Sequence, residues 1–285
     1  MSSRRLMKST TSLANISDLP PAGMAPAQRA VLMSPHTNHT VNRLVTSDQT
    51  SGPSEKYAEA LSYPSGVGKK FHINGSVRAF PGNTIICHLD QASELSGALL
   101  ALYETLRAHR LSHLYSLLPP SSWHMTVFEG VVDAVRTSGH WPSDLAADAP
   151  LRECDESFEQ KLAEFDLQLD PPFNLRISGW QPLVDGIGLR LEPSTPSEEN
   201  NLRGLRDRLS DALKIRHPEH DSYVFHLSIA YLIRHPSPAQ RNGLQDLLDA
   251  ALERMPAAFR LGAPEFCRFD DMFEFRRLFY LERHA

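Results

Sequence analysis

Two short segments of the chain place a histidine and a hydroxyl at the same spacing. Residues 124–127 read H-M-T-V and residues 226–229 read H-L-S-I. Side chains alternate across a β-strand, so His124 and Thr126 would share one face of a strand, as would His226 and Ser228. An imidazole with a pKa of about 6.5 can accept or donate a proton at neutral pH, and a hydroxyl can donate to a charged oxygen. These four residues are the candidate site.

The pattern H-x-[ST] is weak by itself, because it also occurs at His220 and His235. His220 is flanked by acidic residues and His235 precedes a proline, so neither fits the interior of a strand. Only His124 and His226 lie in apolar runs rich in β-branched and aromatic residues. A single buried histidine is usually structural, but its recurrence in two similar runs favours a joint catalytic role.

The elements that would position these runs recur along the chain. Two strands, a helix with a leucine repeat and a histidine strand occur before residue 130 and again between residues 174 and 232. This duplication predicts an α+β fold with two lobes, pseudo-two-fold antiparallel sheets, flanking helices and a central cleft. The predicted strands are 76–80, 83–89, 123–128, 174–180, 186–192, 223–231, 259–269 and 272–281, and the predicted helices are 94–109, 156–165, 198–215 and 239–254.

The composition of the 285 residues is that of a globular protein, with 41% apolar and 22% charged residues. The net charge of −5 argues against a general nucleic-acid coat protein but leaves room for a local basic pocket. Residues 1–64 are rich in Ser, Thr and Pro and are predicted to be a disordered tail. Residues 65–285 are predicted to be the folded domain, and we expect a monomer.

The expected compartment follows from the cysteines and from the apolar runs. Three widely spaced cysteines suggest neither a disulfide framework nor a zinc site, which fits a reducing compartment. No run reaches the length of a membrane helix, so no membrane association is expected. The prediction is a cytoplasmic protein, with a mitochondrial location as the alternative because the N-terminus is basic and rich in Ser and Thr.

The two motifs, their spacing and the order of elements resemble the 2H phosphoesterase superfamily, which includes RNA ligase-like and cyclic phosphodiesterase-like enzymes. The resemblance covers about residues 66–285 and is nearer to uncharacterised bacterial and fungal members than to the RNA ligase-like ones. It implies a phosphoric diester hydrolase that needs neither metal nor cofactor. The implied substrate is a cyclic phosphate, or a 2′,5′ or 3′,5′ diester, of a nucleotide or RNA end, with a role in RNA processing.

Within that mechanism the two histidines would be general base and general acid. The first assignment makes His226 the base for water and His124 the acid for the leaving oxygen, and the two-fold arrangement leaves the reverse almost as well supported. Thr126 and Ser228 would bind the phosphoryl oxygens.

Several alternatives remain open. A metal site would need three converging ligands; the nearby candidates are His88 and Asp90, more simply read as a strand end and a helix cap. A protein that binds a nucleotide or RNA end without turnover, or a scaffold acting through its tail, would keep the same fold.

The run S-G-V-G-K-K at residues 65–70 is not a phosphate loop, because it lacks the first glycine and the hydroxyl of that motif. Lesser candidates are Arg78, Arg190, Arg234 and Arg276 for phosphate and Trp123, Phe128, Tyr223 and Tyr231 for base stacking, Phe128 foremost because it would share the face of Thr126.

Overall fold

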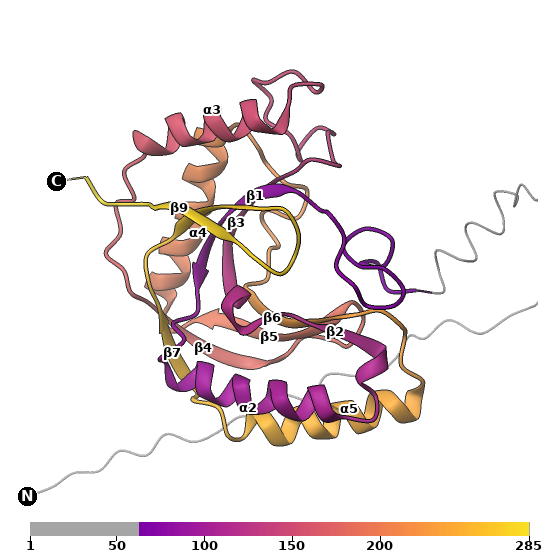
Figure 1. The fold of residues 1–285 in the computed structure, drawn as a ribbon. Coiled ribbons are helices and arrows are strands. Elements are labelled where there is room, and N and C mark those ends of the chain that lie inside the picture. The colour runs from indigo at the N-terminus through magenta and orange to yellow at the C-terminus, as the bar shows by residue number, and fades with distance from the viewer. Residues whose placement is uncertain (1–62, 285) are drawn as a thin grey trace, which may run out of the picture. The chain divides into compact units, whose positions relative to one another are not determined.

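The computed structural model describes residues 63–284 (Figure 1). The predicted tail, residues 1–64, lies outside the described residues except for Tyr63 and Pro64. In the described part, no helix has the length and apolar character needed to cross a bilayer. The strands are β1 (Gly82–His88), β2 (Tyr115–Leu117), β3 (His124–Val132), β4 (Phe173–Trp180), β5 (Gly186–Pro193), β6 (His226–Leu232), β7 (Ala258–Leu261), β8 (Glu265–Phe269) and β9 (Arg276–Tyr280), and the α-helices are α2 (Glu94–Ala108), α3 (Leu151–Ala163), α4 (Pro196–Leu213) and α5 (Pro238–Leu252).

Across residues 63–284 the strands form one antiparallel sheet of nine. Their order is β7-β4-β5-β6-β3-β1-β8-β9, and β2 pairs with β6 off this path. The two histidine strands, β3 and β6, are neighbours in the middle of the sheet. Three strands extend outward from each of them: β1, β8 and β9 from β3, and β5, β4 and β7 from β6. The predicted α+β fold with two pseudo-two-fold lobes is confirmed.

The helices bury the leucine faces that the sequence predicted. Both α2 and α4 place leucines at helical spacing against the core, and both begin at a side-chain cap, Ser93 for α2 and Thr195 for α4. Helix α4 packs on β3, on β5 and on α3. In the view of Figure 1, α2 and α5 lie along the lower side of the strands and α3 along the upper side.

Several predicted strands were wrong in their extent, since the strand predicted at 223–231 begins only at His226 and the one predicted at 272–281 only at Arg276. Residues 76–80 form no strand, and β8 instead lies beside β1, in the place that β4 occupies beside β5. The predicted strand 259–269 is divided into β7 and β8 by Gly262, Ala263 and Pro264. A proline cannot donate to a sheet ladder, which explains the break. The short strand β2 was not predicted.

The connection between β7 and β8 shows how strongly the sheet curls. β7 pairs with β4 and β8 pairs with β1, so the two strands belong to opposite halves of the sheet. Only residues 262–264 join them. Such a connection spans at most about 14 Å, since each residue contributes at most roughly 3.6 Å. The two halves therefore curve toward each other.

Candidate active site

The four predicted residues line one cavity of about 260 Å³. Met125 of β3 pairs directly with Leu227 of β6. Continuing this antiparallel register by one residue sets His124 opposite Ser228, and Thr126 opposite His226. The intervening residues on both strands are fully buried on the other face of the sheet. The structure thus brings together all four residues in an arrangement with local two-fold symmetry.

Each histidine strand carries a bulge shortly after its hydroxyl residue, and the bulge changes which side chain comes next on the cavity face. In β3 the pairing with β1 shifts between Thr126 and Phe128, and in β6 the pairing with β5 shifts between Ser228 and Ala230. The inserted residue brings Glu129 and Tyr231 to the cavity.

The predicted place of Phe128 beside Thr126 is therefore wrong. The bulge turns the Phe128 ring into the protein, where it is fully buried. It lies against the rings of His217 and His220, at centroid distances of 5.8 and 6.1 Å. A strand read with strict alternation cannot reveal such a bulge, because the alternation itself is what the bulge interrupts.

The two imidazoles are held in the same way. His124 Nδ1 lies 2.7 Å from the carbonyl oxygen of Ser122, and His226 Nδ1 lies 2.9 Å from that of Val224. A carbonyl only accepts, so Nδ1 must donate in both rings. In the neutral ring the lone pair is then on Nε2, and in the charged ring Nε2 carries the second proton. Nε2 is the nitrogen that can exchange protons with a bound molecule.

Both imidazoles have a pKa below the ordinary value of a histidine. For His124, burial lowers the pKa to about 3, with smaller lowering from His88 and His226 and a partial offset from the Ser122 carbonyl. For His226, burial also lowers the pKa, and the nearby Lys70 adds to this, while the Val224 carbonyl acts in the opposite direction. His124 is therefore neutral at neutral pH, with the lone pair on Nε2.

A buried arginine on α4 supports the bulge of β3. Arg206 is fully buried, and its Nη1 donates to the Val127 carbonyl at 2.6 Å and to Glu129 at 3.1 Å. The guanidinium carbon lies 4.0 Å from the ring centroid of Tyr223, which lines the cavity. Contacts that extend to α4 thus hold this wall of the cavity in place, and the Arg206 guanidinium neutralises the Glu129 carboxylate.

The rest of the cavity wall comes from two irregular segments. Lys70 and Phe80 lie on the segment before β1, and Met272 and Phe275 lie on the loop between β8 and β9. The Phe275 ring is 4.3 Å from the ring of His124. The walls are consequently aromatic, with one lysine, which suits a nucleobase or sugar beside an anionic group.

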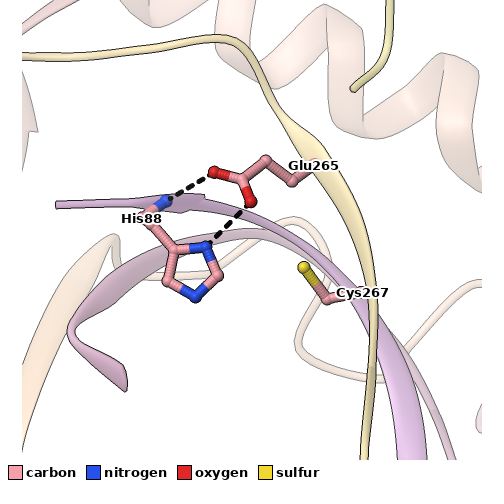
Figure 2. A group of neighbouring side chains, drawn as sticks. All are labelled: His88, Glu265 and Cys267. Carbon is pink, nitrogen blue, oxygen red and sulfur yellow. Dashed lines mark hydrogen bonds and ion pairs between the residues drawn. The ribbon is translucent and has the colours of Figure 1, made fainter. Parts of the chain in front are cut away.

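A second group of titratable side chains consists of His88, Glu265 and Cys267 (Figure 2), and it lies next to His124. The ring of His88 is 6.1 Å from that of His124, and His88 Nδ1 lies 2.9 Å from Glu265 Oε2. Arg277 Nη1 lies 3.3 Å from the same oxygen. Burial raises the pKa of Glu265, but the bond and charge of His88 and the charge of Arg277 outweigh it, so the pKa is lowered. The carboxylate is therefore held ionised.

This group also contains the donors of a potential metal site. The donor atoms of His88, Glu265 and Cys267 all lie within 4.8 Å of one another. However, Glu265 already faces the guanidinium of Arg277, and burial raises the pKa of the Cys267 thiol to about 12. The donor set thus favours an ion-paired carboxylate over a bound cation. Asp90, the other predicted donor, instead accepts the N–H of Ala92 in the turn before α2.

The lesser candidates divide clearly. Tyr223 and Tyr231 line the cavity, whereas Trp123 is buried against Tyr103. The four candidate arginines line no part of the cavity. The sequence reasoning missed Glu129, Lys70, Met272 and Phe275; Lys70 lies in the run that was set aside because it lacks the pattern of a phosphate loop.

Comparisons with known proteins bear on the family and the fold of the chain. A family model described as "2H-phosphodiest: Domain of unknown function (DUF1868)" matches residues 70–184, a segment that contains the first histidine motif. No curated protein matches the chain.

Among solved structures, the conserved protein of unknown function ATU0111 from Agrobacterium tumefaciens str. C58 is 28% identical. Its TM-score is 0.71, over 80% of this chain and 99% of that one. TT0787 of Thermus thermophilus is 17% identical, with a TM-score of 0.41 over 72% of this chain and 100% of that one. Usb1 of Kluyveromyces marxianus is 14% identical, with a TM-score of 0.37 over 66% and 93%. The label of the family model confirms the resemblance to the 2H phosphoesterases over residues 70–184, the segment that the model matches.

Proposed function

We propose that the protein is a phosphodiesterase that hydrolyses a cyclic phosphate, or a 2′,5′ or 3′,5′ diester, at a nucleotide or RNA end, using two histidines and no metal. The observation that carries the proposal is the pair of imidazoles in one cavity, each with Nδ1 donating to a carbonyl and Nε2 left to exchange a proton. The label of the matching family, a 2H phosphodiesterase domain, supports the same reaction class.

In this mechanism water attacks phosphorus while the bond to one ribose oxygen breaks. His124 Nε2 takes the proton of the water, and His226 Nε2 gives its proton to the leaving oxygen. This reverses the first assignment from the sequence, because burial lowers the pKa of His124 to about 3 and so leaves its Nε2 without the proton that a general acid must carry. Thr126 and Ser228 donate to the non-bridging oxygens as negative charge develops there.

The test is product release from 2′,3′-cyclic nucleotides and from RNA with a cyclic phosphate end, measured in EDTA. His124→Ala and His226→Ala are each expected to lower kcat by about 10²–10⁴-fold, the usual contribution of a general acid or base. His235→Ala is the matched control, since His235 also has the H-x-[ST] pattern but is exposed and lines no part of the cavity.

Turnover that survives both substitutions would contradict the proposal. Saturable binding of these compounds without turnover by the unaltered protein would instead favour the nucleotide or RNA-end binding protein. Turnover that EDTA abolishes and added Zn²⁺ restores would show that the metal-free part of the proposal is wrong.

A further inference from the structure

A second hollow adjoins the cavity and carries the segment before β1. It is a groove of about 610 Å³, and it shares Lys70, Phe80 and Tyr231 with the cavity. Its other walls come from residues 65–69 and 78–81 and from residues 133–135 after β3. A molecule bound at the histidines could therefore extend into the groove across Lys70 without leaving the protein surface.

The groove is basic, and its cations are not neutralised by carboxylates. It is lined by Lys69, Lys70 and Arg78. In the described part of the chain, none of these three side chains forms an ion pair. The one acidic residue in the lining, Asp133, is instead paired with Arg136. In a chain with a net charge of −5, this local excess of cations points to an anionic ligand.

Hydrogen bonding points the same way. Arg78 Nε is buried and has no hydrogen-bond partner among the described residues, and Arg78 Nη1 meets only a ring nitrogen, His72 Nδ1, at 3.3 Å. The Arg78 guanidinium thus meets neither a carboxylate nor a carbonyl oxygen in the described part of the chain. Lys70 Nζ lies 2.9 Å from the hydroxyl of Tyr231 and 4.7 Å from the centroid of its ring, which holds the ammonium at the boundary between groove and cavity.

We propose that this groove, named here the basic subsite (Lys69, Lys70 and Arg78), binds a second phosphate of the substrate. The inference rests on the proposed function, because it places the scissile diester at His124 and His226. It narrows the substrate to nucleotides that carry a phosphate beyond the scissile one: a 5′-phosphate on the same nucleoside, or the preceding internucleotide phosphate of an RNA end. A lone cyclic nucleotide with a 5′-hydroxyl would leave the basic subsite empty.

The kinetic test compares three substrates: adenosine 2′,3′-cyclic phosphate, the same compound with a 5′-phosphate, and a diadenylate with a 2′,3′-cyclic end. One charge-assisted contact to phosphate is expected to lower KM by about tenfold or more, with little change in kcat. The ratio of KM values with and without the second phosphate is expected to fall toward one in Lys69→Gln and Arg78→Gln. Arg254→Gln, which changes an exposed arginine just after α5, should keep the full ratio. The compound with the larger decrease in KM shows whether the basic subsite prefers a 5′-phosphate or an internucleotide phosphate.

An equilibrium measurement separates this inference from the proposed reaction. In calorimetry, adenosine 2′,5′- and 3′,5′-bisphosphate are expected to bind about tenfold more tightly than the 2′- and 3′-monophosphates, and Arg78→Gln should remove the difference. Equal affinity, or a difference that both Lys69→Gln and Arg78→Gln leave intact, would overturn the basic subsite even if the histidines hydrolyse every substrate. Tight bisphosphate binding without turnover would support the basic subsite and contradict the proposed hydrolase activity.

Discussion

At the scale of single residues, the two histidines share a hydrogen-bond arrangement but differ in their surroundings. Each ring donates from Nδ1 to the carbonyl two residues earlier in the chain, so both present the same nitrogen to the cavity. His124 is packed against Phe275 and lies beside His88, whereas His226 has Tyr223 and Lys70 nearby. Equivalent positions in the fold thus provide environments that can favour different proton-transfer roles.

This difference gives a test of the two roles that uses the leaving group. A p-nitrophenyl phosphodiester releases a stable anion and needs no proton from the protein, whereas a ribose diester does. His226→Ala is expected to lose about 10²–10⁴-fold on the ribose diester and about tenfold or less on the p-nitrophenyl ester, while His124→Ala should lose comparably on both. The opposite pattern would restore His226 as the base. The measurement is kcat for each variant on each substrate.

At the scale of elements, the site depends on a bulge in each histidine strand and on the helix behind one of them. Arg206 of α4 holds the carbonyl of Val127 and the carboxylate of Glu129 where β3 departs from regular pairing. Breaking a buried ion pair from one side leaves the other charge unpaired, which is more costly than losing an exposed pair.

We therefore expect Arg206→Met to lower the free energy of unfolding by roughly 3–5 kcal/mol, since it leaves the Glu129 carboxylate and two carbonyl groups without their hydrogen-bond donor. Glu129→Gln, which keeps an acceptor for Arg206, should cost only about 1–3 kcal/mol. The control is Glu156→Gln in the exposed pair Arg152–Glu156, with a loss below about 1 kcal/mol. Urea unfolding of the full chain measures all three, and equal losses for the first and third variants would refute the supporting role of Arg206.

The elements also show how far the sequence could predict this site. The leucine repeats identified α2 and α4, and alternation correctly placed His124 with Thr126 and His226 with Ser228, because these are local patterns. Glu129 was missed because a bulge depends on the partner strand.

The cavity walls were missed for a different reason. Lys70 and Phe275 lie on irregular segments without periodicity, so only the folded chain brings them to the histidines. The position of β8 beside β1 is likewise a choice between distant strands that no local pattern encodes. The catalytic roles of the four predicted residues stay predictions until the variants are measured.

At the scale of the whole molecule, two buried neutral histidines make the free energy of unfolding depend on pH. Burial lowers the pKa of His124 and His226 in the folded protein, while the unfolded chain keeps a value of about 6.5. Below a pH of about 6.5 the unfolded state binds protons that the folded state does not, so stability falls as the pH falls. For His124 this loss continues until the pH approaches about 3.

The expected slope is about 1.4 kcal/mol per pH unit for each such proton. Between about pH 6.5 and 5, His124→Asn should therefore lose about 2 kcal/mol less stability than the unaltered protein, whatever its stability at neutral pH. His113→Asn, which changes an exposed histidine, should follow the unaltered protein. The measurement is the free energy of urea unfolding at each pH, and parallel pH profiles for all three proteins would exclude a buried neutral His124.

The three residues between β7 and β8 have a consequence for how a substrate enters. These residues connect β7, the edge strand paired with β4, to β8, which lies between β1 and β9, so they link the outer parts of the two lobes. A connection of at most about 14 Å limits how far the two lobes can separate by a hinge motion. Substrate entry is then expected to depend on the two irregular segments that line the cavity, residues 66–80 and 270–275, and not on separation of the lobes.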